Sequence, residues 1–525
     1  MFSYKLKYMK LIKIILLSIL SAVSIDAAAQ DLNDAYRFSR QELTGTARFV
    51  GMSGAFGALG GDLSSLKINP AGSAVFLTNH AAFSLDQNFN NVSTRFGTLS
   101  AQTDETRRRN FDMSQAGLVF VFRNNDQGSP VNKITFGINY DRTFNHDARF
   151  SSFGSTEETI GNYFVERANG FTVNDFTPNN QNFSNFYRNL GQNFGFAAQE
   201  AYLAYESFLI DPSAQDNSTF ISNTNSSLYN NDIITRESGL NGHVAFNLGT
   251  QLYEKLYLGM NLNFHFINYD RFSSYLETND GPGDIREVYY ENDLRTRGSG
   301  FSLQFGAIYK PVEQVRIGLS YQSPTWFRIE DEIVQGIETF SQAQNEYITA
   351  FPDVVVLFPA YDFRSPMKTT FSFAYIFGKN GLLSMDYTYQ DYSNQRFTSR
   401  GFEDLNFQID NVFQATHNFN IGGEYRLGKY SFRSGYHFAE SPYSAPVSNN
   451  SSGNLTGTNY QGMTIGDTNG FSLGLGYNFG STTLDIAWRR TYLERNDNFV
   501  QTGLQSRAYV ENTINNLMLS LAFQF

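Results

Sequence analysis

Apolar and polar residues alternate in short runs over most of the chain, from Asn79 to Phe525. Within Lys255–Tyr269, one face carries the side chains of Leu256, Leu258, Met260, Leu262, Phe264 and Phe266, and the other face carries those of Asn261, Asn263 and His265. A period of two residues predicts β-strands, and strands with one apolar and one polar face are typical of a transmembrane β-barrel. Because a slip of one residue would turn the polar face toward lipid, the pattern also predicts the register.

We predict about fourteen such strands, an even number as expected for a single-chain bacterial barrel. They are Asn79–Asn90, Met113–Arg123, Asn132–Thr143, Ser238–Leu252, Lys255–Tyr269, Arg297–Lys310, Glu313–Glu330, Met367–Gly378, Gly381–Phe397, Phe413–Leu427, Lys429–Ala439, Asn469–Gly480, Ser481–Leu493 and Glu511–Phe525. The predicted fold class is all-β, an antiparallel transmembrane barrel over residues 79–525.

The connections between these strands alternate in length. The short ones are Asn124–Val131, Tyr253–Glu254, Pro311–Val312, Lys379–Asn380, Gly428 and Gly480-Ser481. The long ones are Asn91–Asp112, Phe144–Glu237, Asp270–Thr296, Asp331–Pro366, Thr398–Val412, Glu440–Thr468 and Glu494–Val510. Short turns on one side and long loops on the other are the arrangement of outer-membrane barrels, in which the long loops are extracellular. A soluble β-sandwich has no reason to segregate its loops in this way.

Residues 1–29 have the features of a secretory signal peptide. Four lysines precede or interrupt the apolar run Leu11–Val23, and Ala27-Ala28-Ala29 offers small residues for cleavage before Gln30. The apolar run is shorter than the roughly 20 residues that a membrane-spanning helix requires. We therefore expect export, cleavage and a final location in the outer membrane of a Gram-negative bacterium.

Charge and composition fit this location. The chain has a formal net charge of −11, and loss of the lysine-rich first 29 residues makes the mature protein more acidic still, so we expect no nucleic-acid partner. There is no cysteine for a disulfide or a thiol site. The mean hydropathy of −0.35 does not exclude a membrane barrel, because a barrel also has a polar lumen and polar loops. The 50 Phe and 31 Tyr suit lipid-facing bands and interfacial girdles.

The stretch Thr44–Ala74 differs from everything that follows it. It is rich in Gly and Ala, which make poor strands but allow tight packing in a confined space. We predict that residues 30–78 form a plug, or hatch, inside the barrel. The spacing of Gly54, Gly57, Gly60 and Gly61 lacks the order, the Lys-Ser/Thr end and the βαβ context of a phosphate-binding loop.

Several segments resemble the FadL/TodX family of outer-membrane transporters for long-chain fatty acids and other hydrophobic compounds. They are Gly51–Phe56 and Asn69–Gly72 in the hatch, Arg316–Tyr321, Ser365-Pro366 with Met385–Tyr387, and His417–Tyr425 with Arg433–Tyr436 and Pro442. The resemblance covers the mature chain and implies passive transport of hydrophobic molecules such as fatty acids or aromatic hydrocarbons. Some relatives are labelled hemin receptors, so a hemin-binding receptor is one alternative, and an adhesive or structural barrel is another.

The family resemblance also implies a mechanism. A hatch closes the lumen, and an inward kink in the third strand leaves a lateral opening through which cargo enters the membrane. By this resemblance Asn69-Pro70-Ala71 would be the gate and would contact the kinked strand, here Asn132–Thr143. Gly137 and Asp141 have the lumen-facing parity of that strand and are candidate contacts. Without the resemblance, Asn-Pro is a turn signal.

Capture of cargo is predicted in the second long loop. Ala197–Ile210 has the apolar spacing of a short amphipathic helix that ends at Asp211-Pro212. Tyr202, Tyr205 and Leu209 lie on its apolar face and are candidate cargo contacts. Alternatively, this face packs only on the loop itself.

Three histidines, His243, His265 and His437, have lumen-facing parity. His243 and His265 lie on hairpin partners and should face each other, an arrangement that can bind a metal or heme iron but is more often part of a polar lumen. No nucleophile motif such as Gly-x-Ser-x-Gly stands out, so we expect neither an enzyme nor a resident cofactor or metal. The C-terminal Phe525 resembles the end that such barrels present to the barrel-assembly machinery, and Arg107–Arg109 is a charge run suited to solvent or to outer-membrane lipopolysaccharide.

Overall fold

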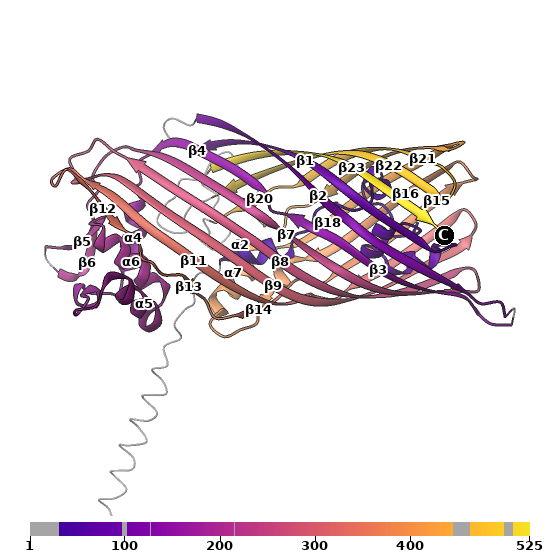
Figure 1. The fold of residues 1–525 in the computed structure, drawn as a ribbon, viewed down its shortest axis with the longest axis horizontal. Helices are drawn as coiled ribbons and strands as arrows, with labels where there is room; N and C mark the ends of the chain where they lie inside the picture. Colours follow the sequence, from indigo (N-terminus) through magenta and orange to yellow (C-terminus); the bar gives the residue numbers. More distant parts are fainter. Residues whose placement is uncertain (1–30, 97–101, 127, 215, 445–461, 498–507) are drawn as a thin grey trace, which may run out of the picture.

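A closed antiparallel β-barrel forms most of the molecule in the computed structural model, which describes residues 31–96, 102–126, 128–214, 216–444, 462–497 and 508–525. The first strand, β1 (His80–Phe96), pairs with the last, β23 (Ala508–Gln524), from His80 opposite Gln524 to Arg95 opposite Tyr509 (Figure 1). Because this pairing closes the sheet, no edge of the barrel is left along that seam. The predicted signal peptide lies outside the described residues.

Fourteen wall positions follow one another around the barrel, and five of them are interrupted strands. In order they are β1; β2 (Gln102–Arg123); β3 (Val131–Asn145) with β4 (Ala148–Thr156); β7 (Tyr229–Leu252); β8 (Leu256–Thr278); β9 (Ile285–Val312); β10 (Val315–Gln322) with β11 (Trp326–Ser341); β14 (Tyr361–Arg364) with β15 (Lys368–Phe377); β16 (Gly381–Asp391) with β17 (Arg396–Phe397); β18 (Ala415–Leu427); β19 (Tyr430–Ala439); β20 (Thr464–Ile465) with β21 (Thr468–Asn478); β22 (Thr482–Asp497); and β23. The predicted all-β barrel of about fourteen strands is confirmed.

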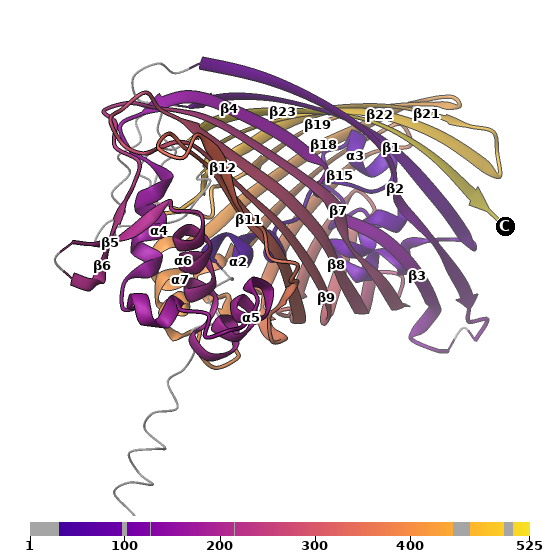
Figure 2. The ribbon, with the colours of Figure 1, turned by 60° about the vertical axis from the view of Figure 1, so that its left-hand side comes forward.

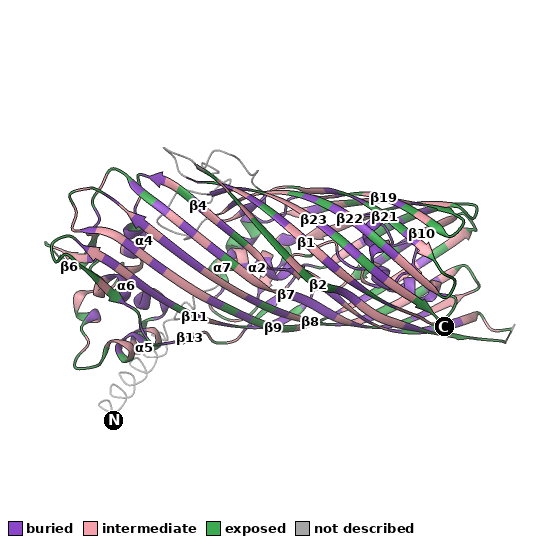
Figure 3. Cartoon of the chain, turned by 45° about the horizontal axis from the view of Figure 1, so that its top comes forward, coloured by how far each residue is buried: buried purple, intermediate pink, exposed green. Residues whose placement is uncertain are grey.

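Burial alternates along these strands as the period of two requires (Figure 3). On β21, Phe471, Leu473 and Leu475 are exposed on the outer face, while Ser472 faces inward and is buried. The outer apolar side chains form the lipid-facing band near the end of the barrel where the short turns lie. Tyr253 and Glu254 adopt positive φ in the three-residue turn between β7 and β8, where Leu252 pairs with Leu256.

Several strands are much longer than the alternation predicts, and this corrects the loop assignments. Parts of the predicted loops 91–112, 270–296 and 331–366 belong to the β-sheet, because β1, β2, β8, β9 and β11 continue beyond the lipid-facing band. On β2 this extension includes Arg107–Arg109, which pair with Asn91, Asn90 and Phe89 of β1. Outside the bilayer an outward side chain no longer needs to be apolar, so the alternation disappears although the strand continues.

The loop between β4 and β7 folds into a helical cap at the extracellular end (Figure 2). The cap contains α4 (Ile160–Ala168), η3 (Val173–Phe176), α5 (Phe183–Phe194), α6 (Phe196–Glu206) and the small hairpin of β5 (Ile210–Ser213) and β6 (Asp216–Ser222). It packs beside the extension of β11 and the short strands β12 (Glu346–Ala350) and β13 (Val356–Leu357). Other short elements at this end are η4 (Tyr392–Asn394) and α7 (Glu403–Val412). None of the described helices is long and apolar enough to cross a membrane.

The N-terminal segment lies inside the barrel, as predicted. It contains α2 (Leu32–Ser39), α3 (Ala47–Gly51), η1 (Leu63–Lys67) and η2 (Pro70–Val75). The last three lie inside the periplasmic half of the lumen, and α2 lies farther toward the extracellular end (Figure 1). Asp31 caps α2, whose apolar face packs on Phe363 and Ile267 of the wall region. The predicted hatch therefore has two separate parts, a floor (residues 44–76) and a helix above it.

Candidate functional site

The hatch floor fits the lumen through close backbone approach and hydrogen bonds. A Cβ atom on Gly422 of β18 would lie 2.3 Å from the carbonyl oxygen of Met52, so only glycine allows this contact. The Asp386 carboxylate on β16 accepts hydrogen bonds from Phe56 N at 2.9 Å and Gly57 N at 3.0 Å. A Cβ atom on Gly57 of the hatch would likewise lie 2.1 Å from Ser372 Oγ, so glycines on both surfaces bring the hatch backbone against the wall.

A buried ionic cluster fixes the periplasmic side of the floor. Arg48 Nε lies 3.0 Å from Glu424 Oε2, and Arg433 and Arg426 each lie 2.6 Å from the same carboxylate. Arg433 also contacts Asp485 at 2.6 Å. Glu424 has a fully buried side chain, so its charge depends on these arginines.

The predicted gate residues bind a different part of the wall than expected. Asn69 Nδ2 donates to the carbonyl of Ala307 on β9 at 3.0 Å, and Asn247 Nδ2 of β7 donates to the carbonyl of Pro70 at 2.9 Å. Asn69 also caps η2 through Ala71 N. The expected contact of Asn69-Pro70-Ala71 with β3 is replaced by contact with β7, β8 and β9, because η2 runs along those strands.

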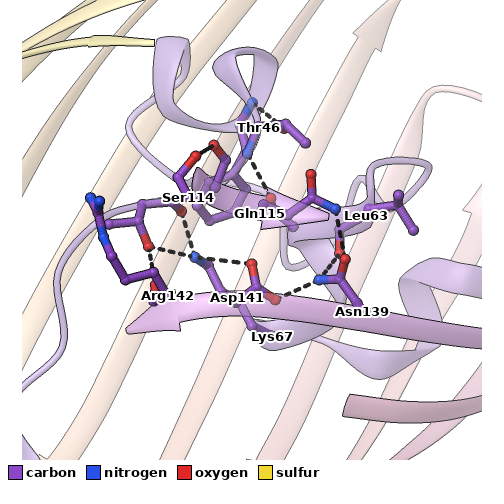
Figure 4. Close-up of polar contacts among 12 residues, drawn as sticks. Thr46, Leu63, Lys67, Ser114, Gln115, Asn139, Asp141 and Arg142 are labelled. Carbon is purple, nitrogen blue, oxygen red and sulfur yellow. Dashed lines mark hydrogen bonds and ion pairs between the residues drawn. The ribbon is translucent and has the colours of Figure 1, made fainter. Parts of the chain in front are cut away.

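Other hatch residues contact β3 (Figure 4). Lys67 Nζ lies 3.7 Å from Asp141 Oδ1, Asn139 Nδ2 lies 3.4 Å from the carbonyl of Leu63, and Ser73 Oγ lies 3.0 Å from Thr135 Oγ1. The predicted candidate Asp141 thus lies at a hatch contact. Gly137 faces the lumen beside Val119 and Asn247.

The wall has a break at the upper end of β3. The β2–β3 ladder runs from Arg123 opposite Lys133 to Gln115 opposite Asp141 and stops there. Among the described residues, β2 from Gln102 to Met113 has a ladder partner only in β1. β3 bulges between Arg142 and Phe144 and stays paired with β7, which then pairs with β4. The third strand therefore leaves its neighbour at the top of the lipid-facing band.

A cavity of about 300 Å³ lies directly above the hatch, and we call it the lower cavity. Its floor includes Phe49, Lys67 and Ile68, and its side is lined by residues 143–148, which form the break. Lys368 and Arg489 also line it. The lower cavity is thus closed beneath by the hatch and bounded laterally by the kinked strand.

A second cavity of about 160 Å³, the upper cavity, lies between α2 and the cap. Apolar residues such as Phe150, Phe196 and Ile233 line it together with Arg167 and Arg271. Both cavities are lined by Tyr36, Arg40, Glu237 and Arg495. The end of α2 therefore separates two chambers in series.

The predicted cargo-binding residues are part of the cap core. Tyr202 and Leu209 have no exposed surface, and Tyr202 packs on Phe176, Phe183 and Phe186. Tyr205 is partly buried against the same core. This packing matches the alternative in which the helix face serves only the loop. Cargo contact by Tyr202, Tyr205 and Leu209 stays a prediction. It requires that the cap opens far enough to expose these side chains.

One charged pair is buried in the cap as well. Arg167 Nε lies 2.9 Å from Glu200 Oε2, and Tyr163 donates to Glu200 Oε1 at 2.6 Å. Burial raises the pKa of the Glu200 carboxyl, and the Arg167 guanidinium opposes this shift.

The three histidines face the lumen as their parity predicts. His243 lies directly opposite His265, with ring centroids 5.2 Å apart, and His265 Nε2 lies 2.9 Å from Ser302 Oγ. His243 and His437 line the lower cavity, but His265 does not. Among the described residues, no group of three or more His, Asp or Glu side chains is placed to hold a metal ion.

Sequence reasoning missed α2, the Glu424 cluster and Arg142 at the break. A signal for α2 exists, because Asp31 and Asp34 have the three-residue spacing of a capping box. The charged pairs carry no such signal, since Arg48 and Glu424 are 376 residues apart.

Comparison with known proteins found a matching family and similar solved structures. The model of the family described as outer membrane protein transport protein (OMPP1/FadL/TodX) matches residues 284–524. The structure of a FadL homologue from Pseudomonas aeruginosa has 13% sequence identity and a TM-score of 0.51, covering 93% of this chain and 100% of that chain. The toluene transporter TodX of P. putida has 12% identity and a TM-score of 0.47, covering 92% and 99%. No curated protein matches the chain.

Fold and site define an outer-membrane β-barrel with an internal hatch. The family match over residues 284–524 confirms the predicted resemblance to FadL/TodX-type outer-membrane transport proteins. The likeness to the FadL homologue concerns the fold alone, since the two sequences are only 13% identical.

Proposed function

We propose that this protein takes up amphipathic hydrophobic molecules, with long-chain fatty acids as the preferred class, by passive movement. Cargo enters through the upper cavity, passes α2 into the lower cavity and leaves sideways into the membrane between β2 and β3. The observation that carries the proposal is the position of the lower cavity. The hatch closes it beneath, and residues 143–148 at the break line its side.

The lining of the lower cavity supports a cargo with an anionic head. Lys67, Lys368 and Arg489 line it, and cationic side chains stabilise a carboxylate. Among the described residues, Lys368 and Arg489 donate to neutral oxygens, to Gln41 at 2.9 Å and to Leu43 and Asn516. A carboxylate would give them a charged partner, which an uncharged hydrocarbon does not offer. The apolar tail has a matching surface in the upper cavity, on Phe150, Phe196 and Ile233.

The experiment is an uptake assay in cells that lack their own transporters of this class. Cells with and without the protein receive a labelled long-chain fatty acid, its uncharged alcohol, a monoaromatic hydrocarbon and hemin. We expect the fatty acid to enter fastest, and Lys368→Met combined with Arg489→Met to reduce the advantage of the acid over the alcohol. Uptake of hemin alone would favour a hemin receptor, and equal uptake with and without the protein would overturn transport.

A matched control separates cavity charge from overall charge. Arg297 pairs with Asp270 at 2.8 Å and is half exposed, and it does not line the lower cavity. Arg297→Met should therefore leave the preference for the acid unchanged.

A further inference from the structure

The kinked third strand passes behind β2 rather than beside it. Phe150 and Ser152 of β4 line the upper cavity. Ser151 between them points the opposite way and donates a hydrogen bond to the Asp104 carboxylate of β2. Asn110 of β2 similarly donates to Asp147 Oδ2 at 3.3 Å. The wall at this height therefore has two layers, with β2 outside and the β3–β4 strand on the lumen side.

The seam between the two layers is polar, and Arg142 lies at its base. Arg142 reaches past β2 to the Asp86 carboxylate of β1, and its Nη1 lies 3.3 Å from Asp112 Oδ2 of β2. The side chains of Arg142 and Asp86 have no exposed surface. One arginine therefore connects three wall strands at the position where the β2–β3 ladder stops.

The hatch covers the same place from inside. Thr44 Oγ1 donates to the carbonyl of Arg142 at 2.5 Å, and Glu42 N donates to the carbonyl of Thr143 at 2.7 Å. Ser114, the bulged residue of β2, donates to the carbonyl of Gly45 at 3.1 Å. The segment between α2 and α3 thus bonds to backbone groups of the kinked strand that the ladder with β2 no longer uses.

We propose that Arg142, with Asp86 and Asp112, is an electrostatic latch that keeps the seam between β2 and the β3–β4 strand shut. The inference rests on the proposed lateral exit and specifies how that exit is controlled. A ladder of backbone hydrogen bonds would have to break one residue at a time, whereas one charged side chain can move to a new partner in a single step. Separating Arg142 from its carboxylates leaves the seam with single hydrogen bonds, such as Ser151 to Asp104 and Asn110 to Asp147, and so weakens the hold of β2 on the strand behind it.

This assignment explains why a charged group lies at this point. A buried ion pair is often no more stable than well-packed apolar side chains, but removing one partner is strongly destabilising. Such a pair therefore has two distinct states, paired and separated, which suits a reversible closure. At the base of the seam β2 presents two apolar side chains to the outside, Phe111 at 62% and Met113 at 46% exposure, so a seam opened at this height leads to lipid.

The test measures the seam itself, apart from transport. The chain has no cysteine, so Phe111→Cys and Arg149→Cys place two spin labels on the outer layer and the inner layer. In full-length protein reconstituted in lipid, Arg142→Met and Asp86→Asn should shift the distance distribution to longer and broader values. Arg297→Met, which removes a distant arginine–aspartate pair, should leave the distribution as in the parent. An unchanged distribution in Arg142→Met would overturn the latch.

Folding and transport are monitored separately. Heat-modifiable migration on gels reports whether each barrel is folded, and Asp112→Asn provides a milder variant that leaves the Arg142–Asp86 pair. If Arg142→Met does not fold, a longer distance in Asp112→Asn supports the latch and an unchanged one overturns it. Uptake of the labelled fatty acid is then compared in the same variants. A seam that opens without faster uptake would leave the latch in place and contradict the lateral exit instead.

A variant whose seam can be cross-linked shut completes the experiment. Asp104→Cys with Ser151→Cys allows a short bifunctional thiol reagent to join the two layers, because the two side chains are in hydrogen-bond contact. Cross-linking should abolish the distance shift that Arg142→Met produces. A shift that persists after cross-linking would show that Arg142 does not act at this seam.

Discussion

The hatch floor and the extracellular cap are both built from segments without long strands, yet different interactions hold them in place. The cap has a large core in which aromatic rings such as Phe164, Phe176 and Tyr187 are almost fully buried. The hatch has a smaller apolar cluster around Phe49 and Phe56, and it meets the wall mainly through hydrogen bonds and charged pairs.

This difference has a physical consequence. The free energy gained by burying apolar surface is lost in proportion to the area that is exposed again. Opening the cap would expose much of its apolar core, so we expect the cap to be rigid. Polar contacts between the hatch and a polar lumen can exchange for contacts with water at little net cost, since each contributes only about 1 kcal/mol. We therefore expect the hatch to be held less rigidly than the cap.

The largest effect is expected from a cavity in the cap. Phe176→Ala removes a ring that packs on Phe171, Tyr202 and Phe220 and should destabilise the cap by about 3–5 kcal/mol. Hydrogen exchange in residues 160–222 should accelerate, while the barrel strands keep their protection. If the barrel lost protection to the same extent, the cap would not be an independent module.

A smaller effect is expected where the hatch meets the floor of the barrel. Glu424→Gln leaves Arg48, Arg433 and Arg426 without their shared carboxylate, which should weaken docking of the hatch by about 3 kcal/mol. The single-channel conductance of the reconstituted protein should rise because the hatch leaves the lumen more often. Glu332→Gln, which removes an exposed partner of Arg295 at 3.4 Å, serves as the control and should not change conductance.

The smallest effect is expected at the predicted gate. Asn69→Ala removes the hydrogen bonds to Gly57 and Ala307 and the cap of η2, a loss of about 1–2 kcal/mol. Conductance should rise less than in Glu424→Gln. A larger rise in Asn69→Ala would show that the hatch is held chiefly at β7–β9, and the comparison between charged and neutral contacts would fail.

The lipid-facing strands could be predicted well because each carries its own signal. On β8 the alternation from Leu256 to Phe266 reflects contact with lipid on one side and the lumen on the other, so neighbouring residues alone contain the information. The extensions of β8 and β9 carry no such signal. Residues there, such as Arg271 and Asp293, are polar whichever side of the strand they occupy. Only their pairing with the neighbouring strand shows that they belong to the sheet.

The candidate site could be predicted only in part. The small residues of the hatch and Asp141 were identified from the sequence, and Lys67 lies within 4 Å of Asp141 in the structure. The orientation of Asn69-Pro70-Ala71 toward β7–β9 could not be predicted, because it depends on how η2 turns inside the barrel. Tyr202 and Leu209 were expected beside a cargo groove, but helices α4 and α5 and the η3 turn cover them.

The amino-acid sequence by itself determined the wall of this protein. Its period of two defines which residues face lipid and which face the lumen, and the small residues of the N-terminal stretch match an enclosed space. The tertiary structure alone decided where the β2–β3 ladder ends and which side chains meet there. Arg142, Asp86 and Asp112 belong to three strands and have no local pattern. They meet only because the third strand kinks behind β2, and that kink depends on pairings between distant parts of the chain.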